Sequence, residues 1–366
     1  MKASVIIPVR NQSFLTRLCL AALELVDLGD AEVIVVDNGS TDDTPDLLTQ
    51  WARSPERRVL RSHYNRNFGP GCNWGATEAH GDVLVFLNND TFVLQDWLPA
   101  LIRSFADQSV TAAGSLLLYP NGRVQHAGVA FDQHGPFHVF SGLPPDCPVV
   151  QDPRDCQAVT GASLAVRRDD FEAVGGFDGS YQNSGEDIDL CLRLRERGGR
   201  IRYIPDSVAY HFESMTEGRL DANQRGLDLL KERWASRWVH DLPQLAETAA
   251  AAGCDLSDRR LPAPEVMDRF RSPETREQRL SRLEAMEREV NELWIQFRER
   301  EQELSQLHLL QEQVAQLRRR IELVRPLEQE VAELRAKLNR RSVRLGLAAG
   351  RLGRKVIPPR HPPTPD

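Results

Sequence analysis

Two adjacent carboxylates, Glu186 and Asp187, follow a glycine and open a stretch whose apolar residues have helical spacing. One carboxylate oxygen can hold a hydroxyl group while another takes its proton, which is the work of a general base. Part of this acidity also has a structural interpretation, because Asp189 favours the start of a helix and Arg193 and Arg195 can pair along it. The dipeptide is still the sharpest local indication of acid–base chemistry.

A second polar turn, Asn88-Asn89-Asp90, directly follows the apolar run 82–87. Hard divalent cations prefer oxygen ligands, so Asp90 and the neighbouring amides can hold Mg²⁺ or Mn²⁺ through one or two contacts, with a diphosphate completing the coordination. His211 could add an imidazole, which favours Mn²⁺. Polar turns after buried strands are common, and a single histidine on an apolar strand is more often a core residue, so neither motif is decisive alone.

Two further segments could bind a nucleotide. Asp37 follows the four aliphatic residues 33–36, where its carboxylate can accept a hydrogen bond from a nucleobase imide or a ribose hydroxyl, or can form an Asx-turn or helix N-cap instead. Residues 65–75 predict a glycine- and amide-rich turn that leads into a helix over 74–79 and offers side-chain amides to ribose or base. The chain lacks both G-x-G-x-x-G and G-x-x-x-x-G-K-[ST] here, which disfavours a dinucleotide fold and a P-loop.

Short apolar runs alternate with helical patterns from Met1 to about His240, which predicts an α/β domain built around a mostly parallel sheet. In such sheets ligands bind beyond the carboxyl ends of the strands, so residues 8–11, 37–40 and 88–90 should face one crevice. Residues 112–159 carry a weaker pattern and are expected to form loops and short strands that shape a pocket. The clearest predicted elements are the strands 4–9, 32–37 and 82–87 and the helices 14–26 and 46–52.

The composition fits a globular enzyme with an extension. The chain has 366 residues, 41% hydrophobic and 27% charged, and its net charge of −7 argues against a general nucleic-acid binder. Its six cysteines form no Cys-x-x-Cys pair, which favours reduced thiols over a zinc site or a disulfide framework. No basic-then-apolar leader opens the chain, and no apolar run approaches the ~18 residues that span a bilayer. We therefore expect a cytoplasmic protein that is not integral to a membrane.

The pattern changes after residue 240. Residues 241–273 are rich in Ala, Pro, Asp and Arg without a period, and we expect a linker there. Residues 274–340 repeat apolar side chains every three or four positions, which predicts a coiled coil and a homo-oligomer, or alternatively an amphipathic helix folded back onto the catalytic domain. Residues 341–366 alternate Arg and Lys with aliphatic residues, which predicts either an amphipathic helix on an anionic membrane surface or a disordered basic tail.

Taken in order, these motifs resemble the family 2 glycosyltransferases with the GT-A fold, a Rossmann-like sheet flanked by helices. The resemblance covers roughly residues 3–240 and points to the branch that includes bacterial rhamnosyltransferases and other O-antigen or cell-wall glycan enzymes. The segments that carry it are 4–11, 35–42, 65–75, 87–90, Thr160-Gly161-Ala162, 175–178, 185–190 and His211.

The resemblance implies a role for each matching position. Asp187 corresponds to the general base and Glu186 to the neighbour that positions the acceptor, while Asp90 and His211 correspond to metal ligands. The family's first Asp of Asp-x-Asp is here Asn88. Positions implied to bind the nucleotide-sugar are Pro8, Val9, Arg10, Asn11, Asp37, Asn38, Asn67, Gly69, Asn73, Asn88, Asn89, Asp90 and Gly161.

The implied reaction is an inverting, metal-dependent transfer of a sugar from a nucleoside-diphosphate sugar to a hydroxyl of a glycan or lipid-linked glycan. The donor suggested by the branch is dTDP-rhamnose or a UDP-hexose, with Mg²⁺ or Mn²⁺ as cofactor and the inner face of the plasma membrane as a place of action. Two other classes stay open. A sugar nucleotidyltransferase would require a glycine-rich, Lys- or Arg-bearing loop after the first strand, which Pro8 to Gln12 do not provide. An inactive scaffold would act through its coiled coil.

Overall fold

The computed structural model describes residues 1–255 except 55, 183 and 213–218. It divides the chain into two units, Met1–Glu274 and Thr275–Asp366. The predicted coiled coil at 274–340 and the predicted basic tail at 341–366 therefore lie outside the described residues, and both stay predictions. Among the described residues, no helix is both long and apolar enough to cross a bilayer.

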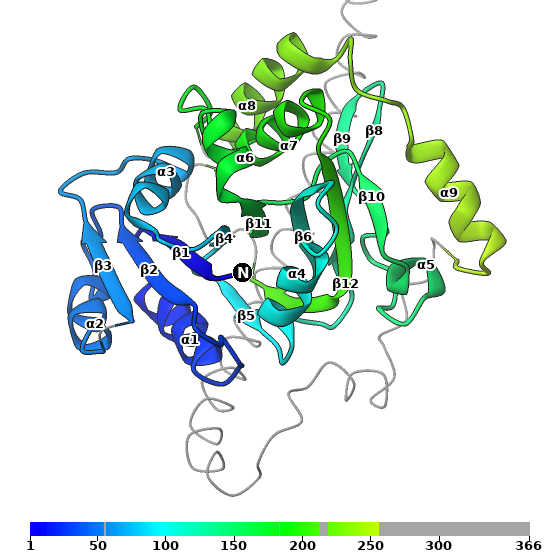
Figure 1. Cartoon of the computed structure of the whole chain (residues 1–366). Coiled ribbons are helices and arrows are strands. Elements are labelled where there is room, and N and C mark those ends of the chain that lie inside the picture. The colour runs from blue at the N-terminus through cyan, green and yellow to red at the C-terminus, as the bar shows by residue number, and fades with distance from the viewer. Residues whose placement is uncertain (55, 183, 213–218, 256–366) are drawn as a thin grey trace, which may run out of the picture. The chain divides into compact units, whose positions relative to one another are not determined.

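A mixed sheet forms the centre of the first unit, with the strand order β10-β12-β6-β11-β4-β1-β2-β3 (Figure 1). Its parallel half comprises β1 (Ala3–Val9), β2 (Glu32–Asp37), β3 (Arg57–Arg61) and β4 (Val83–Leu87). Its other half comprises β6 (Val110–Leu118), β10 (Arg154–Cys156), β11 (Ser163–Arg167) and β12 (Arg200–His211), and the short strands β5 (Thr91–Val93) and β7 (Val124–His126) pair with β12 and β6.

The prediction of a mostly parallel sheet is wrong for the second half. Strand β11 runs antiparallel to both of its neighbours, β4 and β6. Strand β7 is also antiparallel to β6, because only a tight turn closed by Tyr119 and Arg123 joins them, and a parallel pair would need a longer crossover. The expected α/β sheet with flanking helices is otherwise confirmed, and β1, β2 and β4 lie within one residue of their predicted bounds.

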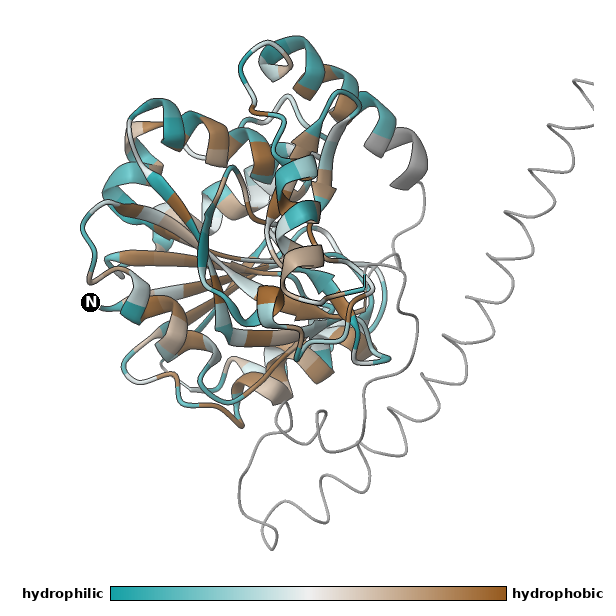
Figure 2. Cartoon of the chain, turned by 90° about the vertical axis from the view of Figure 1, so that its right-hand side faces the viewer, coloured by the Kyte–Doolittle hydropathy of each residue, from teal (hydrophilic) through white to brown (hydrophobic). Residues whose placement is uncertain are grey.

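Helices cover both faces of the sheet, which explains why the central strands are apolar on both sides. Strand β1 shows the division, since Val5 and Ile7 pack towards one helical layer and Ile6 towards the other. Figure 2 shows the strands as a mostly brown layer between the helices. The first layer contains α1 (Ser13–Leu23) and α4 (Trp97–Ser104), and the second contains α3 (Phe68–Glu78), α6 (Arg168–Ala173), α7 (Glu186–Glu196) and α8 (Arg219–Trp234).

The segment predicted as a linker contributes to the core instead. Helix α9 (Leu242–Ala251) packs on the hairpin of β8 (Val129–Asp132) and β9 (Gly135–His138), near the short helix α5 (Pro148–Gln151). Ala249 and Cys254 are buried there, and Asp241 accepts the main-chain N–H of Phe131 at 2.8 Å. The linker prediction is therefore wrong for 242–251. The apolar face of this alanine-rich helix is small, so the sequence shows no clear periodicity, and the helix is recognised only by its packing against β8.

Candidate active site

The turn after β4 brings Asp90 to His211. Strand β5 pairs antiparallel with the end of β12, which sets His211 opposite Thr91, the residue after Asp90. The His211 Nε2 atom lies 3.2 Å from Asp90 Oδ1 and 3.3 Å from Asn88 Nδ2. The main-chain N–H of Phe212 also donates to Asp90 O at 2.9 Å. The structure thus joins the two predicted metal ligands, which are 121 residues apart in the sequence (211 minus 90).

These side chains fit a divalent cation with two protein ligands. A carboxylate oxygen and an imidazole nitrogen converge within 3.2 Å, and this donor set suits Mn²⁺. Within the described residues, no group of three or more His, Cys, Asp or Glu side chains could hold a metal ion. The remaining coordination positions would therefore belong to the phosphates of a bound nucleotide, as in sites that keep open positions for substrate.

Asp187 lies at the start of α7, whose N-cap Gly185 has a φ of +88°. Its Oδ2 accepts the main-chain N–H of Gly161 at 2.7 Å, and its Oδ1 accepts that of Ile188 at 2.8 Å. The side chain is half-buried, and each carboxylate oxygen keeps a further lone pair. Asp187 is therefore held in position by the backbone and can still accept a proton.

Glu186 has a different environment from Asp187. It is 6% exposed, and its charge adds to burial in raising the pKa of the Cys72 thiol well above its ordinary value. Glu186 therefore lies on the α3 side of the helix start, among buried groups. A role in positioning an acceptor stays a prediction for this residue.

The turn at 160–162 makes hydrogen bonds both to Asn88, close to the candidate metal ligands, and to Asp187, the candidate base. The N–H of Asn88 donates to Ala162 O at 3.0 Å, and β4 pairs with β11 immediately after this turn. One residue earlier, Gly161 donates to Asp187. Asn88 and Asp187 therefore lie on either side of a three-residue turn, so both predicted centres of chemistry meet at the same end of the sheet.

The loops after β1 and β2 bind each other. Asn11 donates its N–H to Ser40 Oγ at 2.8 Å and accepts the N–H of Thr41 at 2.7 Å. Asp37 is 1% exposed, accepts the N–H of Ser40 at 2.9 Å, and lies 3.4 Å from Arg61 Nε. This is the turn-forming role that the sequence left open for Asp37, with an arginine covering its second oxygen.

The other predicted nucleotide-sugar contacts near β1 and β4 are Pro8, Val9, Arg10 and Asn89. Pro8 and Val9 are buried within β1, whereas Arg10 is exposed. Their predicted contact with the nucleotide-sugar stays a prediction. Asn89 donates from Nδ2 to Thr16 Oγ1 at 2.9 Å, which ties the turn after β4 to helix α1.

The predicted turn at 65–75 is mostly helix, because α3 begins at Phe68. Asn67 precedes it with a φ of +67°, and its main-chain oxygen lies 3.4 Å from Nδ2 of the buried Asn38. A Cβ at Gly69 would lie 3.0 Å from Phe177 Cβ, so that glycine permits close packing. Asn73 donates to Phe177 O at 2.8 Å and accepts its N–H at 2.9 Å. The predicted turn conformation is therefore wrong at Gly69 and Asn73, which lie in α3, while their predicted contact with the nucleotide-sugar stays a prediction.

Comparison with known proteins identifies the domain. Residues 4–132 match the sequence profile described as Glycosyl transferase family 2, and residues 83–239 match Glycosyl transferase family group 2. Residues 4–239 form a family 2 glycosyltransferase domain. The chain is 35% identical over 234 residues to the O-antigen biosynthesis protein RfbC of Myxococcus xanthus, covering 60% of this chain and only 18% of that protein. It is 29% identical over 224 residues to an N-acetylglucosaminyl-diphospho-decaprenol L-rhamnosyltransferase of Mycobacterium tuberculosis, covering 55% and 72%.

Solved structures share the fold of this family 2 domain. The mannosyltransferase PcManGT from Pyrobaculum calidifontis, in complex with GDP-Man and Mn²⁺, superposes with a TM-score of 0.50 at 20% identity, covering 68% of this chain and 73% of that one. GalNAc-T7 with UDP, GalNAc and Mn²⁺ gives a TM-score of 0.52 at 19% identity, covering 70% and 55%. The likeness supports a GT-A-like mixed sheet with flanking helices, as the sequence resemblance implied.

Strand β7 of the family 2 domain contributes two buried residues that the sequence did not single out for the site. Gln125, 1% exposed, contacts His211. His126 is fully buried, and its Nε2 lies 3.4 Å from the N–H of Thr160, next to Gly161. Burial lowers the pKa of His126 well below its ordinary value, so the ring is neutral and can accept this N–H. No sequence signal marks them, because β7 has only three residues and two of them are polar.

Asp189 is a buried carboxylate that binds three side chains, beyond its predicted role of favouring the start of the helix. It is 1% exposed and binds Arg193 Nε at 2.7 Å, Trp234 Nε1 at 2.8 Å and the Tyr181 hydroxyl at 3.2 Å. These contacts join the first turn of α7 to α8 and to the preceding loop. They fix the helix start that carries Asp187.

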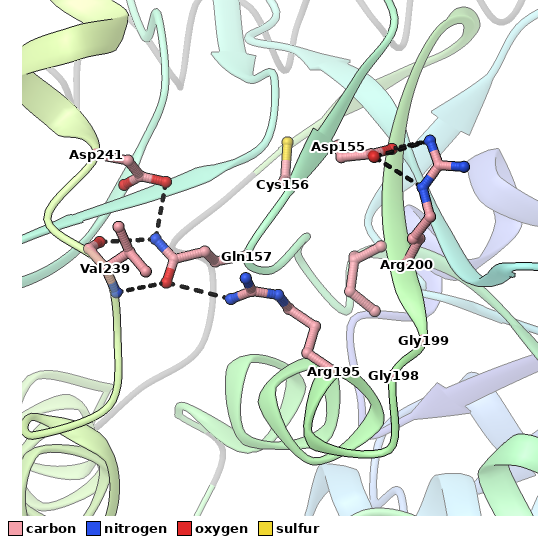
Figure 3. A pocket seen from close by; sticks show the side chains of 10 residues that line it. Asp155, Cys156, Gln157, Arg195, Gly198, Gly199, Arg200, Val239 and Asp241 are labelled. Atoms are coloured by element: carbon pink, nitrogen blue, oxygen red, sulfur yellow. Dashed lines mark hydrogen bonds and ion pairs between the residues drawn. The ribbon is translucent and has the colours of Figure 1, made fainter.

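A surface cavity of the domain lies at the opposite end of α7 (Figure 3). It is bordered by Arg195 and Gly198, whereas Asp187 is in the first turn of the same 11-residue helix, about 12 Å away along its axis. Its charged side chains are paired, since Arg200 binds Asp155 and Arg195 binds Gln157. The cavity is therefore separate from the candidate active site.

Proposed function

We propose that the chain is an inverting glycosyltransferase that moves a sugar from a nucleoside-diphosphate sugar to a hydroxyl of a glycan or lipid-linked glycan in surface polysaccharide assembly. The observation that carries this proposal is the turn at 160–162. Its Ala162 O accepts the N–H of Asn88, beside Asp90 and His211, and its Gly161 N–H donates to the Asp187 carboxylate. A pair of side chains suited to a divalent cation and a carboxylate that can take a proton, both at one end of the sheet, match the needs of this transfer.

The proposed reaction begins at Asp187. Its carboxylate accepts the proton of the acceptor hydroxyl, and that oxygen bonds to the anomeric carbon of the donor sugar. The bond from the anomeric carbon to the diphosphate breaks on the opposite face, so the configuration inverts. The bonds from Gly161 and Ile188 hold the carboxylate in one orientation, which keeps it within reach of the hydroxyl.

Asp90 and His211 would hold the divalent cation, Mg²⁺ or Mn²⁺, beside the donor diphosphate. When bound there, such a cation offsets the negative charge that develops on the leaving diphosphate. Two protein ligands 3.2 Å apart leave room for phosphate oxygens, and the PcManGT and GalNAc-T7 structures each contain Mn²⁺ together with a nucleotide or nucleotide-sugar. Because Asn88 stands where the family's Asp-x-Asp motif has its first aspartate, this site carries one negative charge fewer than that motif.

The donor and acceptor classes rest on the relatives. The Mycobacterium tuberculosis relative is named as a rhamnosyltransferase acting on a decaprenol-linked sugar, and the Myxococcus xanthus relative as an O-antigen biosynthesis protein. These names favour dTDP-rhamnose as the donor, with UDP-hexoses next, and a lipid-linked glycan as the acceptor. A thermal-shift screen of dTDP-, UDP- and GDP-sugars with Mn²⁺ and Mg²⁺ would rank the donors.

Substitution of the proposed base provides the decisive test. Asp187→Asn keeps the size of the side chain and removes its basicity, so turnover should fall by about 10²- to 10⁴-fold while donor binding persists. Exposed Asp169, in the first turn of α6, provides a matched control as Asp169→Asn. Release of the nucleoside diphosphate measures turnover, and thermal shift measures donor binding. Turnover by Asp187→Asn within a few-fold of the wild type would overturn the assignment, and a wild type that turns over no nucleotide-sugar would favour the scaffold alternative.

A further inference from the structure

The side-chain amide of Gln125 contacts His211 through two hydrogen bonds. The Nε2 atom of Gln125 donates to the main-chain oxygen of His211 at 3.3 Å, and its Oε1 atom lies 2.7 Å from His211 Nδ1. Gln125 is 1% exposed and His211 5% exposed, so water does not compete for either bond. Strand β6 lies between β7, which carries Gln125, and β12, which carries His211.

This pair of bonds determines which way the Gln125 amide faces. A main-chain carbonyl oxygen can only accept a hydrogen bond, so the atom that faces His211 O must be the NH₂ group of Gln125. The carbonyl oxygen of the amide then faces His211 Nδ1. Because that oxygen is itself an acceptor, Nδ1 must carry the proton.

The proton on Nδ1 leaves Nε2 of a neutral imidazole with its lone pair. That lone pair lies 3.2 Å from Asp90 Oδ1 and 3.3 Å from Asn88 Nδ2, which can donate to it. A nitrogen lone pair and a carboxylate oxygen at this distance are suited to share a cation. With the proton on Nε2 instead, Asp90 would accept it, and the proton would occupy the position that the cation needs.

We propose that Gln125 is a positioning residue that fixes the Nδ1-protonated tautomer of His211 and so presents Nε2 and Asp90 together to a divalent cation. The inference rests on the proposed function, because it gives the Asp90–His211 pair its role. Gln125 acts through His211. Partners of this kind commonly contribute 10- to 100-fold to metal affinity.

Two substitutions separate the tautomer role from simple packing. Gln125→Met fills similar space and offers neither bond. Gln125→Glu keeps an acceptor for Nδ1–H and loses the donor to His211 O. If Gln125 only braced the backbone, both variants would behave alike. Gln157 provides the matched control, since it is 4% exposed and binds Val239 by the same two-bond pattern, at 2.7 and 2.8 Å, beside the distant cavity (Figure 3).

The first measurement is the protonation of His211 in the full chain without metal, from ¹⁵N shifts of the histidine ring nitrogens, with His211→Ala identifying the signals. The wild type and Gln125→Glu should show the proton on Nδ1, and Gln125→Met should show it moving to Nε2. A wild-type proton on Nε2, or a tautomer that does not change in Gln125→Met, would overturn the inference.

The second measurement is Mn²⁺ binding by electron paramagnetic resonance titration in the presence of UDP or dTDP. Gln125→Met should weaken Mn²⁺ binding about 10- to 100-fold, Gln125→Glu should retain most of the affinity, and Gln157→Met should lose thermal stability with unchanged affinity. Binding that is weakened by His211→Ala but not by Gln125→Met refutes the inference alone. A wild type that takes up no Mn²⁺ with either nucleotide refutes the metal part of the proposed function, and the inference with it.

Discussion

The main-chain N–H of Gly161 donates to Oδ2 of Asp187 across 2.7 Å. The bond joins the turn before β11 to the first turn of α7, two segments that meet only because both lie at one end of the sheet. It fixes the proposed base relative to the turn that also receives the N–H of Asn88. Displacement of this turn should therefore affect catalysis more than stability.

Gly161→Ala tests that relationship. A Cβ at this position would lie 3.2 Å from Asp187 Cβ and 3.2 Å from Phe68 Cζ, so the turn or the base must move by a few tenths of an ångström. We expect kcat to fall about 10- to 100-fold with little change in melting temperature, since small misplacements of catalytic groups have effects of this size. Gly179→Ala is the control, because its Cβ would make an ordinary 3.5 Å contact with Pro70. Equal kcat values for the two variants would contradict the assigned role of the Gly161 bond.

Removal of the metal should abolish turnover. We expect EDTA to inactivate the wild type and Mn²⁺ to restore it. Asp90→Ala and His211→Ala should each lower kcat/KM by about 100-fold, the usual effect of losing one electrostatic contact to the transition state. Asp46→Asn, which changes an exposed carboxylate in the first turn of α2 (Thr44–Trp51), should have no effect. Full activity in EDTA would show that the Asp90–His211 pair serves another purpose.

Asp189→Asn should destabilise the domain. The carboxylate is 1% exposed and pairs with Arg193, whose side chain is 21% exposed, so the substitution leaves a largely buried cation without its partner. We expect a loss of about 3 kcal/mol, the lower end for broken buried pairs, because Arg193 keeps a bond to Val174 O. Urea denaturation measures the change. Trp234→Phe removes one neutral donor to the same carboxylate and should cost less, about 1–2 kcal/mol.

Asp178 should make stability depend on pH in the acid range. Burial alone would raise the pKa of this carboxyl group, but hydrogen bonds from Ser180 and Arg233 outweigh it and hold the pKa at about 2, against an ordinary 3.8. A carboxyl pKa lowered by folding contributes stability that is present above the ordinary pKa and is lost as pH falls towards 2. Arg233 lies on α8, so the contribution links that helix to the turn before α7.

Comparison with Asp178→Asn isolates this contribution from the general effect of acid. At pH 5 to 7 the variant should melt about 2 °C lower, because a pair about one-third exposed contributes under about 1 kcal/mol. The difference should close as the pH approaches 2, when the wild-type carboxyl group is protonated. Melting curves at several pH values measure the gap. A difference that stays constant from pH 7 to pH 2.5 would rule out the ionised pair as its source.

Local pattern in the sequence was enough to predict the central strands and to propose the residues of the candidate site. Strands β1, β2 and β4 are mostly continuous runs of apolar residues, because both faces of each strand are buried. Such runs can be recognised in a sequence without knowledge of the fold. Asp90 and Asp187 could be proposed from the sequence because their motifs occur together and in the order of a known family, although each motif alone also has a structural explanation. The order of the motifs along the chain is enough to indicate the family.

Tertiary packing decided what local pattern could not. Helix α3 starts at Phe68 despite three glycines in its sequence up to Gly75. A Cβ at Gly75 would lie 2.4 Å from Ile6 Cγ2, so this glycine permits close packing against β1 rather than forming a turn. The antiparallel insertion of β11 and the docking of α9 depend likewise on distant partners. Gln125 is the clearest example of a residue whose role could not be predicted from the sequence. A single glutamine on a three-residue strand has no periodic signature, and its meaning comes from His211, 86 residues further along the chain, which only folding brings to it.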